Sequence, residues 1–215
     1  EKSRAEVLQS ARDEDTGEGM SDTQLRDEVA TLVLAGHETT ANLLTWAIHL
    51  VSTRPEVEAR LLAEVRRVLG DRVPTFADLA ELPYTRAIVD ETLRLFPPAW
   101  VVERQAIEAD EVMGYRIPKG AVIAVSPYVI HRHPGYWENP EAFDPDRFMK
   151  TGEAAASAEA ARPRYAYIPF GAGPRFCIGN NFALMEAQLV LAMLVRSAHF
   201  SMRAGHRIAL EPLIT

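Results

Sequence analysis

An apolar repeat with helical spacing runs through residues 22–53, and it constrains the fold more than any other feature of the sequence. Apolar side chains recur three and four positions apart until Pro55 interrupts the pattern. Ser21, followed three positions later by Gln24, has the spacing of a capping box that begins a helix. The pattern predicts one long helix over 22–53, of roughly 30 residues against a mean of about 11. A helix of this length usually crosses the core of its domain.

Helical and strand-like patterns follow one another in the rest of the chain. Helices are expected at 55–69, after Thr75, at 84–96 and at 180–198, and β segments at 100–107, 111–118 and 121–127. Residues 128–170 are rich in proline, glycine and aromatic residues, which predicts coil, with 150–163 as a surface insertion. The residues after 198 predict short strands. We therefore expect a mainly α fold with a small β-sheet.

The composition is typical of a soluble globular protein, with 47% hydrophobic and 25% charged residues. A formal net charge of -7 argues against a nucleic-acid binder. No apolar run approaches the roughly 20 residues of a membrane-spanning helix, and the first residues lack the regions of a signal peptide. We therefore expect a cytoplasmic protein with no visible membrane segment.

The two ends of the sequence suggest a fragment. The chain opens on a polar, helix-like stretch without a methionine and ends within an extended run. Residues 1–215 are then expected to form a single partial domain. An N-terminal anchor, a targeting peptide or another domain outside this sequence stays open.

Cys177 is the only cysteine, so it cannot form an intramolecular disulfide. Taken alone, it is a small buried hydrophobe, a metal ligand or a reactive thiol, and the first is the most common. Its neighbourhood is more informative: residues 170–179, FGAGPRFCIG, here called the cysteine loop, place three glycines around it directly before a helix. The free amide groups and the dipole at a helix start favour an anion such as a thiolate.

The other residues of the cysteine loop suit a large flat ligand. Gly171 and Gly173 allow sharp turns, and Gly179 admits a bulky group close to the chain. Phe170 can shield the sulfur of Cys177 from water.

The cysteine loop matches, position by position, the Phe-x-x-Gly-x-Arg-x-Cys-x-Gly signature of the cytochromes P-450, and the chain resembles this family. The resemblance implies that Cys177 is the thiolate ligand to the iron of haem b, and that Arg175 contacts a haem propionate. It also implies that Phe170 packs over the loop and that Gly179 lies against the haem. In this family thiolate ligation is known to favour O–O cleavage.

Residues 35–40, AGHETT, interrupt the apolar helix with residues of low helix propensity. The Thr39 hydroxyl can bond back to a carbonyl or turn outward to hold water, and a kink sealed by a threonine is an equally good interpretation. In the resembling family this is the oxygen-activation motif. The resemblance assigns Thr39 as its alcohol and Glu38 as the acid that supports proton delivery.

Glu91 and Arg94 have the spacing of an intrahelical ion pair, which by itself carries little information. They match the family's Glu-x-x-Arg helix, and 143–148, FDPDRF, matches its Pro-x-Arg-Phe element. The resemblance implies that Glu91, Arg94 and Arg147 interlock and fix the coil that carries the cysteine loop, without a catalytic role.

Arg104, in the first β segment, lies where the family commonly places a second propionate contact. His131 and His133 have an H-x-H spacing that could supply metal ligands, but no partner cluster accompanies them. We interpret both histidines as residues of a polar surface turn.

The resemblance extends from about residue 22 to the end of the chain. It implies the C-terminal, haem-binding half of the P-450 fold, with 22–53 as the central helix. The implied reaction is insertion of one oxygen atom from O2 into an organic substrate, with electrons from a donor such as a ferredoxin or a flavin reductase. The residues expected to line the substrate pocket predict an apolar substrate: Leu34, Ala35, Thr39, 99–102, Leu213 and Ile214.

The family's N-terminal helices, which cover part of the haem, are not in this sequence. We therefore expect the chain to expose a large apolar face and to hold haem poorly by itself. Two alternatives stay open. One is a catalytically silent haem protein, in which Thr39→Ala would leave oxygen consumption unaltered. The other is a non-haem enzyme with Cys177 as nucleophile, although no Cys-His signature accompanies it. A peroxide-driven relative is a variant of the main hypothesis, and the intact acid-alcohol pair argues against it.

Overall fold

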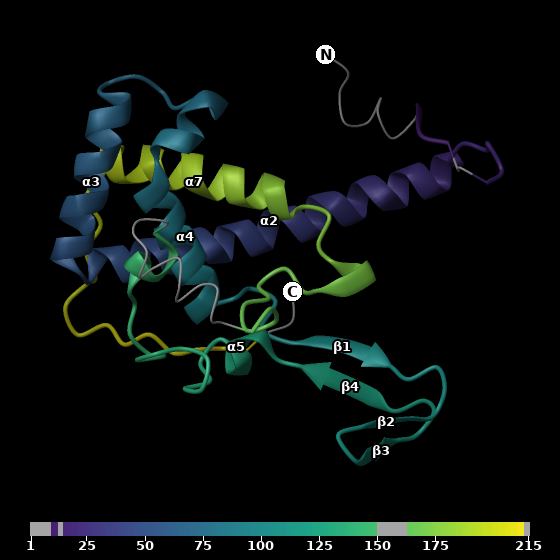
Figure 1. Ribbon diagram of the computed structural model, residues 1–215. Coiled ribbons are helices and arrows are strands. Elements are labelled where there is room, and N and C mark those ends of the chain that lie inside the picture. Colours follow the sequence, from purple (N-terminus) through teal and green to yellow (C-terminus); the bar gives the residue numbers. More distant parts are fainter. Residues whose placement is uncertain (1–9, 13–14, 150–162, 213–215) are drawn as a thin grey trace. The chain divides into compact units, whose positions relative to one another are not determined.

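The computed structural model describes residues 10–12, 15–149 and 163–212 (Figure 1). These residues fall into two compact units that divide between Thr39 and Thr40, within a helix that continues through the division. That helix, α2 (Asp22–Ser52), corresponds to the range 22–53 expected from the apolar repeat. At its start the Gln24 N–H donates to Ser21 Oγ at 3.2 Å, which is one half of the expected capping box.

The second unit is built around helix α4. Its longer elements are the part of α2 from Thr40 onward, α3 (Pro55–Leu69), the 3-10 helix η1 (Phe76–Glu81), α4 (Pro83–Leu95) and α7 (Asn180–Ser197). Helices α3 and α4 both begin with a proline, whose fixed φ suits the first helical turn. Gly70, at φ 53°, ends α3 as the sequence predicts.

The core of the second unit lies where α2, α3, α4 and α7 meet. Helix α4 contacts α3, α7 and the 3-10 helix η2 (Pro145–Phe148). The central buried side chains are apolar and come from all four helices: Leu43, Ala47, Leu61, Val65, Ile88, Val89, Leu93, Ala187 and Leu191. This core fixes α4 and the middle of α7, the helix that follows the cysteine loop in the chain.

The β segments form two small antiparallel sheets, where the sequence suggested one. Strand β1 (Val102–Gln105) pairs with β4 (Val122–Val125), and β2 (Asp110–Val112) pairs with β3 (Tyr115–Ile117) at the end of that ribbon (Figure 1). Met113 and Gly114, both at positive φ, make the turn between β2 and β3. The expected class, mainly α with a little β structure, is confirmed.

Of the expectations for the irregular segments, the one for coil is confirmed in the described residues and the one for strands near the end of the chain is wrong. Residues 128–149 and 163–170 are mostly coil, apart from η2 and the end of a short helix, α5 (Pro127–Ile130), while 150–162 of the expected insertion lie outside the described residues. The short strands expected after α7 are wrong for the described residues 198–212, which contain none. These residues are almost wholly exposed, and a strand needs a neighbouring edge to pair with. None of the described helices is both long and apolar enough to cross a membrane.

Candidate functional site

The cysteine loop is a closed turn that presents Cys177 to solvent. The Cys177 N–H donates to the Phe170 carbonyl at 3.0 Å, and this backbone hydrogen bond joins the two sides of the loop. Gly171 and Gly173 adopt φ values of 73° and 71°, which residues with a side chain rarely reach. A short 3-10 turn, η3 (Gly173–Arg175), follows, and α7 begins at Asn180. Cys177 is exposed and has no disulfide partner.

The surroundings of the Cys177 sulfur are open and apolar. A Cβ added to Gly173 would meet nothing within 4 Å, and one added to Gly179 would lie 3.8 Å from the Cys177 Sγ. Phe176 and Ile178 are 48% and 90% exposed, although large apolar side chains are usually buried. Phe170 packs edge-to-face on Phe176, with ring centroids 6.5 Å apart. A flat apolar group anchored by one sulfur donor fits this donor set and this surface.

Two arginines were predicted to bind the propionates of such a group. Arg175 is exposed in the cysteine loop, and no carboxylate in the described part of the chain forms an ion pair with it. Arg104 lies in β1, and its Nη1 donates to the carbonyl of Glu103 at 2.7 Å. Arg175 can therefore bind an anion without breaking a described ion pair.

Glu38 and Thr39 lie in the first unit, at its boundary within α2. The Thr39 hydroxyl donates to the Ala35 carbonyl at 2.6 Å, which is the first of the two arrangements that the sequence allows. The helix continues through this motif, and a Cβ added to Gly36 would meet nothing within 4 Å. Of the residues predicted to line a pocket, Leu213 and Ile214 lie outside the described residues.

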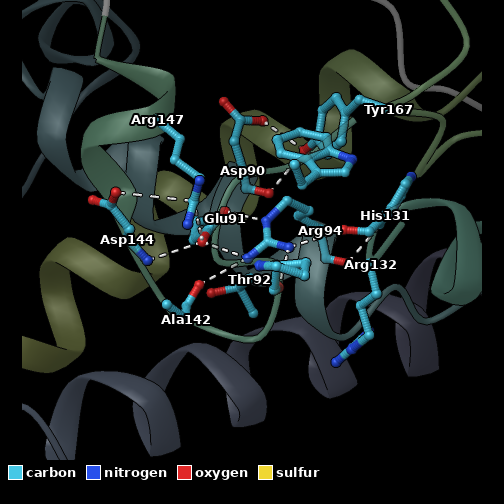
Figure 2. A network of polar contacts seen from close by, with 12 residues as sticks. Asp90, Glu91, Thr92, Arg94, His131, Arg132, Ala142, Asp144, Arg147 and Tyr167 are labelled. Carbon is cyan, nitrogen blue, oxygen red and sulfur yellow. Dashed lines mark hydrogen bonds and ion pairs between the residues drawn. The ribbon is translucent and has the colours of Figure 1, made fainter. Parts of the chain in front are cut away.

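A buried charge network joins α4 to the coil that follows the β segments (Figure 2). Arg94 and Glu91, both 0% exposed, form a two-pronged pair: Arg94 Nε donates to Glu91 Oε2 at 2.6 Å and Nη2 donates to Oε1 at 2.8 Å. The remaining Arg94 hydrogen bonds go to the carbonyls of His131, Pro140 and Ala142, at 2.9, 2.6 and 2.9 Å. One guanidinium thus fixes the path of the coil from 131 to 142.

Arg147 completes the network from η2. Its Nε lies 3.5 Å from Glu91 Oε1, and the Asp144 N–H donates to the same oxygen at 2.9 Å. Burial raises the pKa of the Glu91 carboxyl, while Arg94, the Asp144 amide and Arg147 act in the opposite direction. The expected interlocking of one glutamate with two arginines is confirmed.

The expectation for His131 is wrong, while that for His133 is confirmed. His133 is exposed, but His131 is 0% exposed, and both of its ring nitrogens have backbone partners. The sequence could not indicate this, because these partners, Arg94 and Ile168, are each 37 positions away. No cluster of three or more potential metal ligands occurs among the described residues.

The mainly α fold and the cysteine loop together define a class of protein in which one exposed cysteine sulfur is available to a prosthetic group. Residues 3–211 match the family model of cytochrome P-450. The chain belongs to the cytochrome P-450 family.

Proteins of known sequence and structure support this assignment. The chain is 46% identical over 188 residues to cyclooctatin synthase and 40% identical over 188 residues to cyclooctat-9-en-7-ol 5-monooxygenase, both from Streptomyces melanosporofaciens. Each alignment covers 87% of this chain and 40% of the relative. The crystal structure of the cytochrome P-450DA haem domain superposes with a TM-score of 0.80 at 38% identity, over 88% of this chain and 41% of that one. The chain therefore spans about 40% of the length of these relatives.

Proposed function

We propose that the protein is a haem-thiolate monooxygenase that inserts one oxygen atom from O2 into an apolar organic substrate. The observation that carries this proposal is the exposed Cys177 thiol, held on a glycine turn whose sequence carries the family signature. When bound, haem b supplies an iron at which O2 is activated, and the thiolate ligation known for this family favours cleavage of the O–O bond. The two S. melanosporofaciens relatives, one of them named as a monooxygenase, support the same reaction class.

Residues of the cysteine loop have distinct parts in this proposal. Cys177 provides the metal ligand as a thiolate, and Arg175 and Arg104 hold the haem propionates through charge-assisted hydrogen bonds. Phe170 limits the access of water to the sulfur, which preserves its negative charge for the iron. Gly179 keeps space beside the sulfur, because a side chain there would lie within contact distance of the Cys177 Sγ.

Thr39 and Glu38 act as the alcohol and the acid of proton delivery. The Thr39 hydroxyl proton is engaged by the Ala35 carbonyl, so the hydroxyl oxygen keeps lone pairs that can accept a hydrogen bond from water. The Glu38 carboxylate can take up a proton from solvent and release it to such a water. In this arrangement the Thr39 hydroxyl positions the water molecule that donates the proton and is not itself the donor.

Electrons come from a redox partner such as a ferredoxin or a flavin reductase, and we propose a cytoplasmic location. The substrate is expected to be apolar because Leu34 and Ala35 precede the acid-alcohol pair on α2. These statements concern the whole protein, of which this chain is the part that carries the cysteine loop.

The test is the absorption spectrum of the haem-loaded, reduced and carbon monoxide-bound protein, expressed from its full coding sequence. Wild type is expected to show the red-shifted Soret band of a thiolate-ligated haem, and Cys177→Ser is expected to lose it because a hydroxyl is a poor ligand for the iron. Ile178→Ser is the matched control, since it places the same hydroxyl at the adjacent exposed position and leaves the thiol intact.

Retention of the red-shifted band in Ile178→Ser, with its loss in Cys177→Ser, supports the proposal. A wild-type spectrum without this band, or a Cys177→Ser variant that keeps it, would remove Cys177 as the ligand. A wild-type protein that binds no haem would instead support the non-haem alternative, which requires only the thiol.

A further inference from the structure

The three residues that precede Pro169 are each tied to the core by a side-chain hydrogen bond. Trp137 Nε1 donates to the Ala166 carbonyl at 3.2 Å, the Tyr167 hydroxyl donates to the Asp90 carbonyl at 2.9 Å, and the Ile168 N–H donates to His131 Nε2 at 2.8 Å. Of the three, only the contact at Ile168 satisfies a backbone donor. Ile168 is 8% exposed, and a buried N–H without a partner is costly.

The two partners of His131 determine its tautomer. Nε2 faces the Ile168 N–H, which can only donate, so Nε2 must offer a lone pair. Nδ1 lies 3.2 Å from the Arg94 carbonyl oxygen, which can only accept, so Nδ1 must carry the proton. Only the neutral ring with the proton on Nδ1 satisfies both contacts.

The surroundings of His131 favour this neutral form. The pKa of His131 is lowered to about 4, mainly by burial and also by the guanidinium groups of Arg94 and Arg132, while the hydrogen bond to the Arg94 carbonyl acts in the opposite direction. The Tyr167 ring packs against the imidazole at a centroid distance of 5.2 Å (Figure 2). At neutral pH the ring therefore stays uncharged and keeps its acceptor toward Ile168.

Hydrogen bonds and the backbone between them connect His131 to the cysteine loop. The Ile168 residue held by His131 accepts at its carbonyl from the Gly171 N–H at 3.0 Å. Phe170, between these two residues, accepts from the Cys177 N–H at 3.0 Å. The His131 ring thus connects the Arg94 carbonyl, at the end of α4, to the backbone that closes around Cys177.

We propose that His131 is a positioning residue for the cysteine loop: as the Nδ1–H tautomer it fixes Ile168 against the end of α4, and thereby sets where the loop leaves the core. The consequence for the iron rests on the proposed function, whereas the positioning of residues 168–177 does not. His131 acts through Ile168 and has no direct part in the chemistry.

The experiment uses the protein expressed from its full coding sequence, with and without haem. Nitrogen-15 shifts of the His131 ring in wild type report the tautomer directly. Amide hydrogen exchange of Ile168, Gly171 and Cys177 is compared between wild type and two variants. His131→Phe keeps a ring against Tyr167 and removes both nitrogens, whereas His131→Gln restores a side-chain acceptor that can reach the Ile168 N–H. Glu64→Gln is the control, because it weakens contacts at the start of α4 without touching residues 166–168.

We expect a protonated Nδ1 in wild type and, in His131→Phe, exchange at Ile168 faster by about tenfold, the size of one lost buried hydrogen bond. His131→Gln is expected to recover at least part of this protection, and Glu64→Gln to leave it unchanged after correction for global stability. In the haem-loaded protein, His131→Phe should convert part of the red-shifted carbon monoxide band into that of haem without the thiolate, and His131→Gln should reverse this.

A protonated Nε2 in wild type, or unchanged Ile168 exchange in His131→Phe, would overturn the proposal. If His131→Phe does not fold, the wild-type tautomer and the exchange in His131→Gln still decide it: a protonated Nδ1 with Ile168 protected in His131→Gln supports the proposal, and an unprotected Ile168 there overturns it. If wild type lacks the thiolate band altogether, the proposed function fails, while the exchange measurements still test the positioning role.

Discussion

Arg94 shows how much one side chain can organise when its geometry is fixed. The planar guanidinium lies fully buried and donates to both oxygens of Glu91 and to three carbonyls from the coil, those of His131, Pro140 and Ala142. A lysine ammonium carries the same charge but has three donors at a single point, so it cannot serve these acceptors together. The network therefore depends on the shape of the cation as well as on its charge.

Arg94→Lys is expected to lower the free energy of unfolding by about 3–5 kcal/mol, because buried acceptors lose their donors and Glu91 loses its two-pronged partner. Urea unfolding followed by circular dichroism measures the change. Arg26→Lys is the matched control: its pair with Asp27 is 73% and 61% exposed, so a loss below about 0.5 kcal/mol is expected. A loss in Arg94→Lys as small as that of the control would show that charge alone sustains the network.

At the scale of elements, the first turn of α4 is capped from another helix. Glu64, on α3, accepts from the backbone N–H groups of Tyr84 and Thr85 at 2.8 Å each, and from the Thr85 hydroxyl at 2.7 Å. A carboxylate at a helix N-terminus satisfies free amides and complements the helix dipole. The contact joins α3 to the helix that carries the Glu91–Arg94 pair.

Glu64→Gln is expected to lower the free energy of unfolding by about 1–2 kcal/mol, since the amide keeps one acceptor oxygen but loses the charge. Glu56→Gln, at an exposed position in the first turn of α3, should lower the free energy of unfolding by no more than about 0.5 kcal/mol. Thermal and urea unfolding of the two variants side by side measure the difference. Equal effects in both would mean that the contact to α4 adds nothing.

The helices could be predicted from the sequence because their determinants are local. Apolar spacing, prolines at helix starts and Gly70 at a helix end act over a few residues, so the boundaries came close. The two separate sheets and the irregular tail after α7 could not, because strand pairing depends on residues that are distant in the chain. The cap at Glu64 was missed for the same reason: Tyr84 is 20 positions away.

The candidate site divides in the same way. The four predicted site residues of the cysteine loop lie within one short segment, so a single motif brings them together: Phe170, Arg175, Cys177 and Gly179. The Glu91 network was anticipated only through family resemblance, since a pair three residues apart says nothing about burial. His131 was misassigned because a polar, proline-containing neighbourhood hides a ring whose partners lie on α4 and before the cysteine loop.

At the scale of the whole molecule, His131 makes stability depend on pH. The unfolded chain titrates this residue near 6.5, whereas in the folded chain its pKa is about 4. Between these values the unfolded state binds a proton that the folded state does not, so the free energy of unfolding falls as the pH is lowered from 6.5 to 4. The full difference corresponds to roughly 3 kcal/mol.

Denaturant unfolding of wild type and His131→Phe across pH 4 to 7 measures this contribution, and the variant is expected to have a flatter dependence. Glu91 has the opposite sign, because burial raises its pKa and acidification then favours the folded state, but it is present in both proteins. Asp78, whose pKa is lowered by Arg72, adds stability that is lost only below about pH 4. This loss falls at a lower pH than the range in which His131 titrates. Parallel curves for wild type and variant would contradict the prediction.

The hydrogen bonds that Arg94 makes to the coil go to carbonyl oxygens, which every amino acid possesses. The hydrogen bonds of the guanidinium therefore depend on the path of the peptide chain and not on most of the side chains along it. We therefore expect exposed positions between 131 and 142, such as Glu138, to tolerate substitution. A residue inserted or deleted there would move these carbonyls out of hydrogen-bond distance of the buried guanidinium, so we expect the length of this segment to tolerate less change than its exposed side chains.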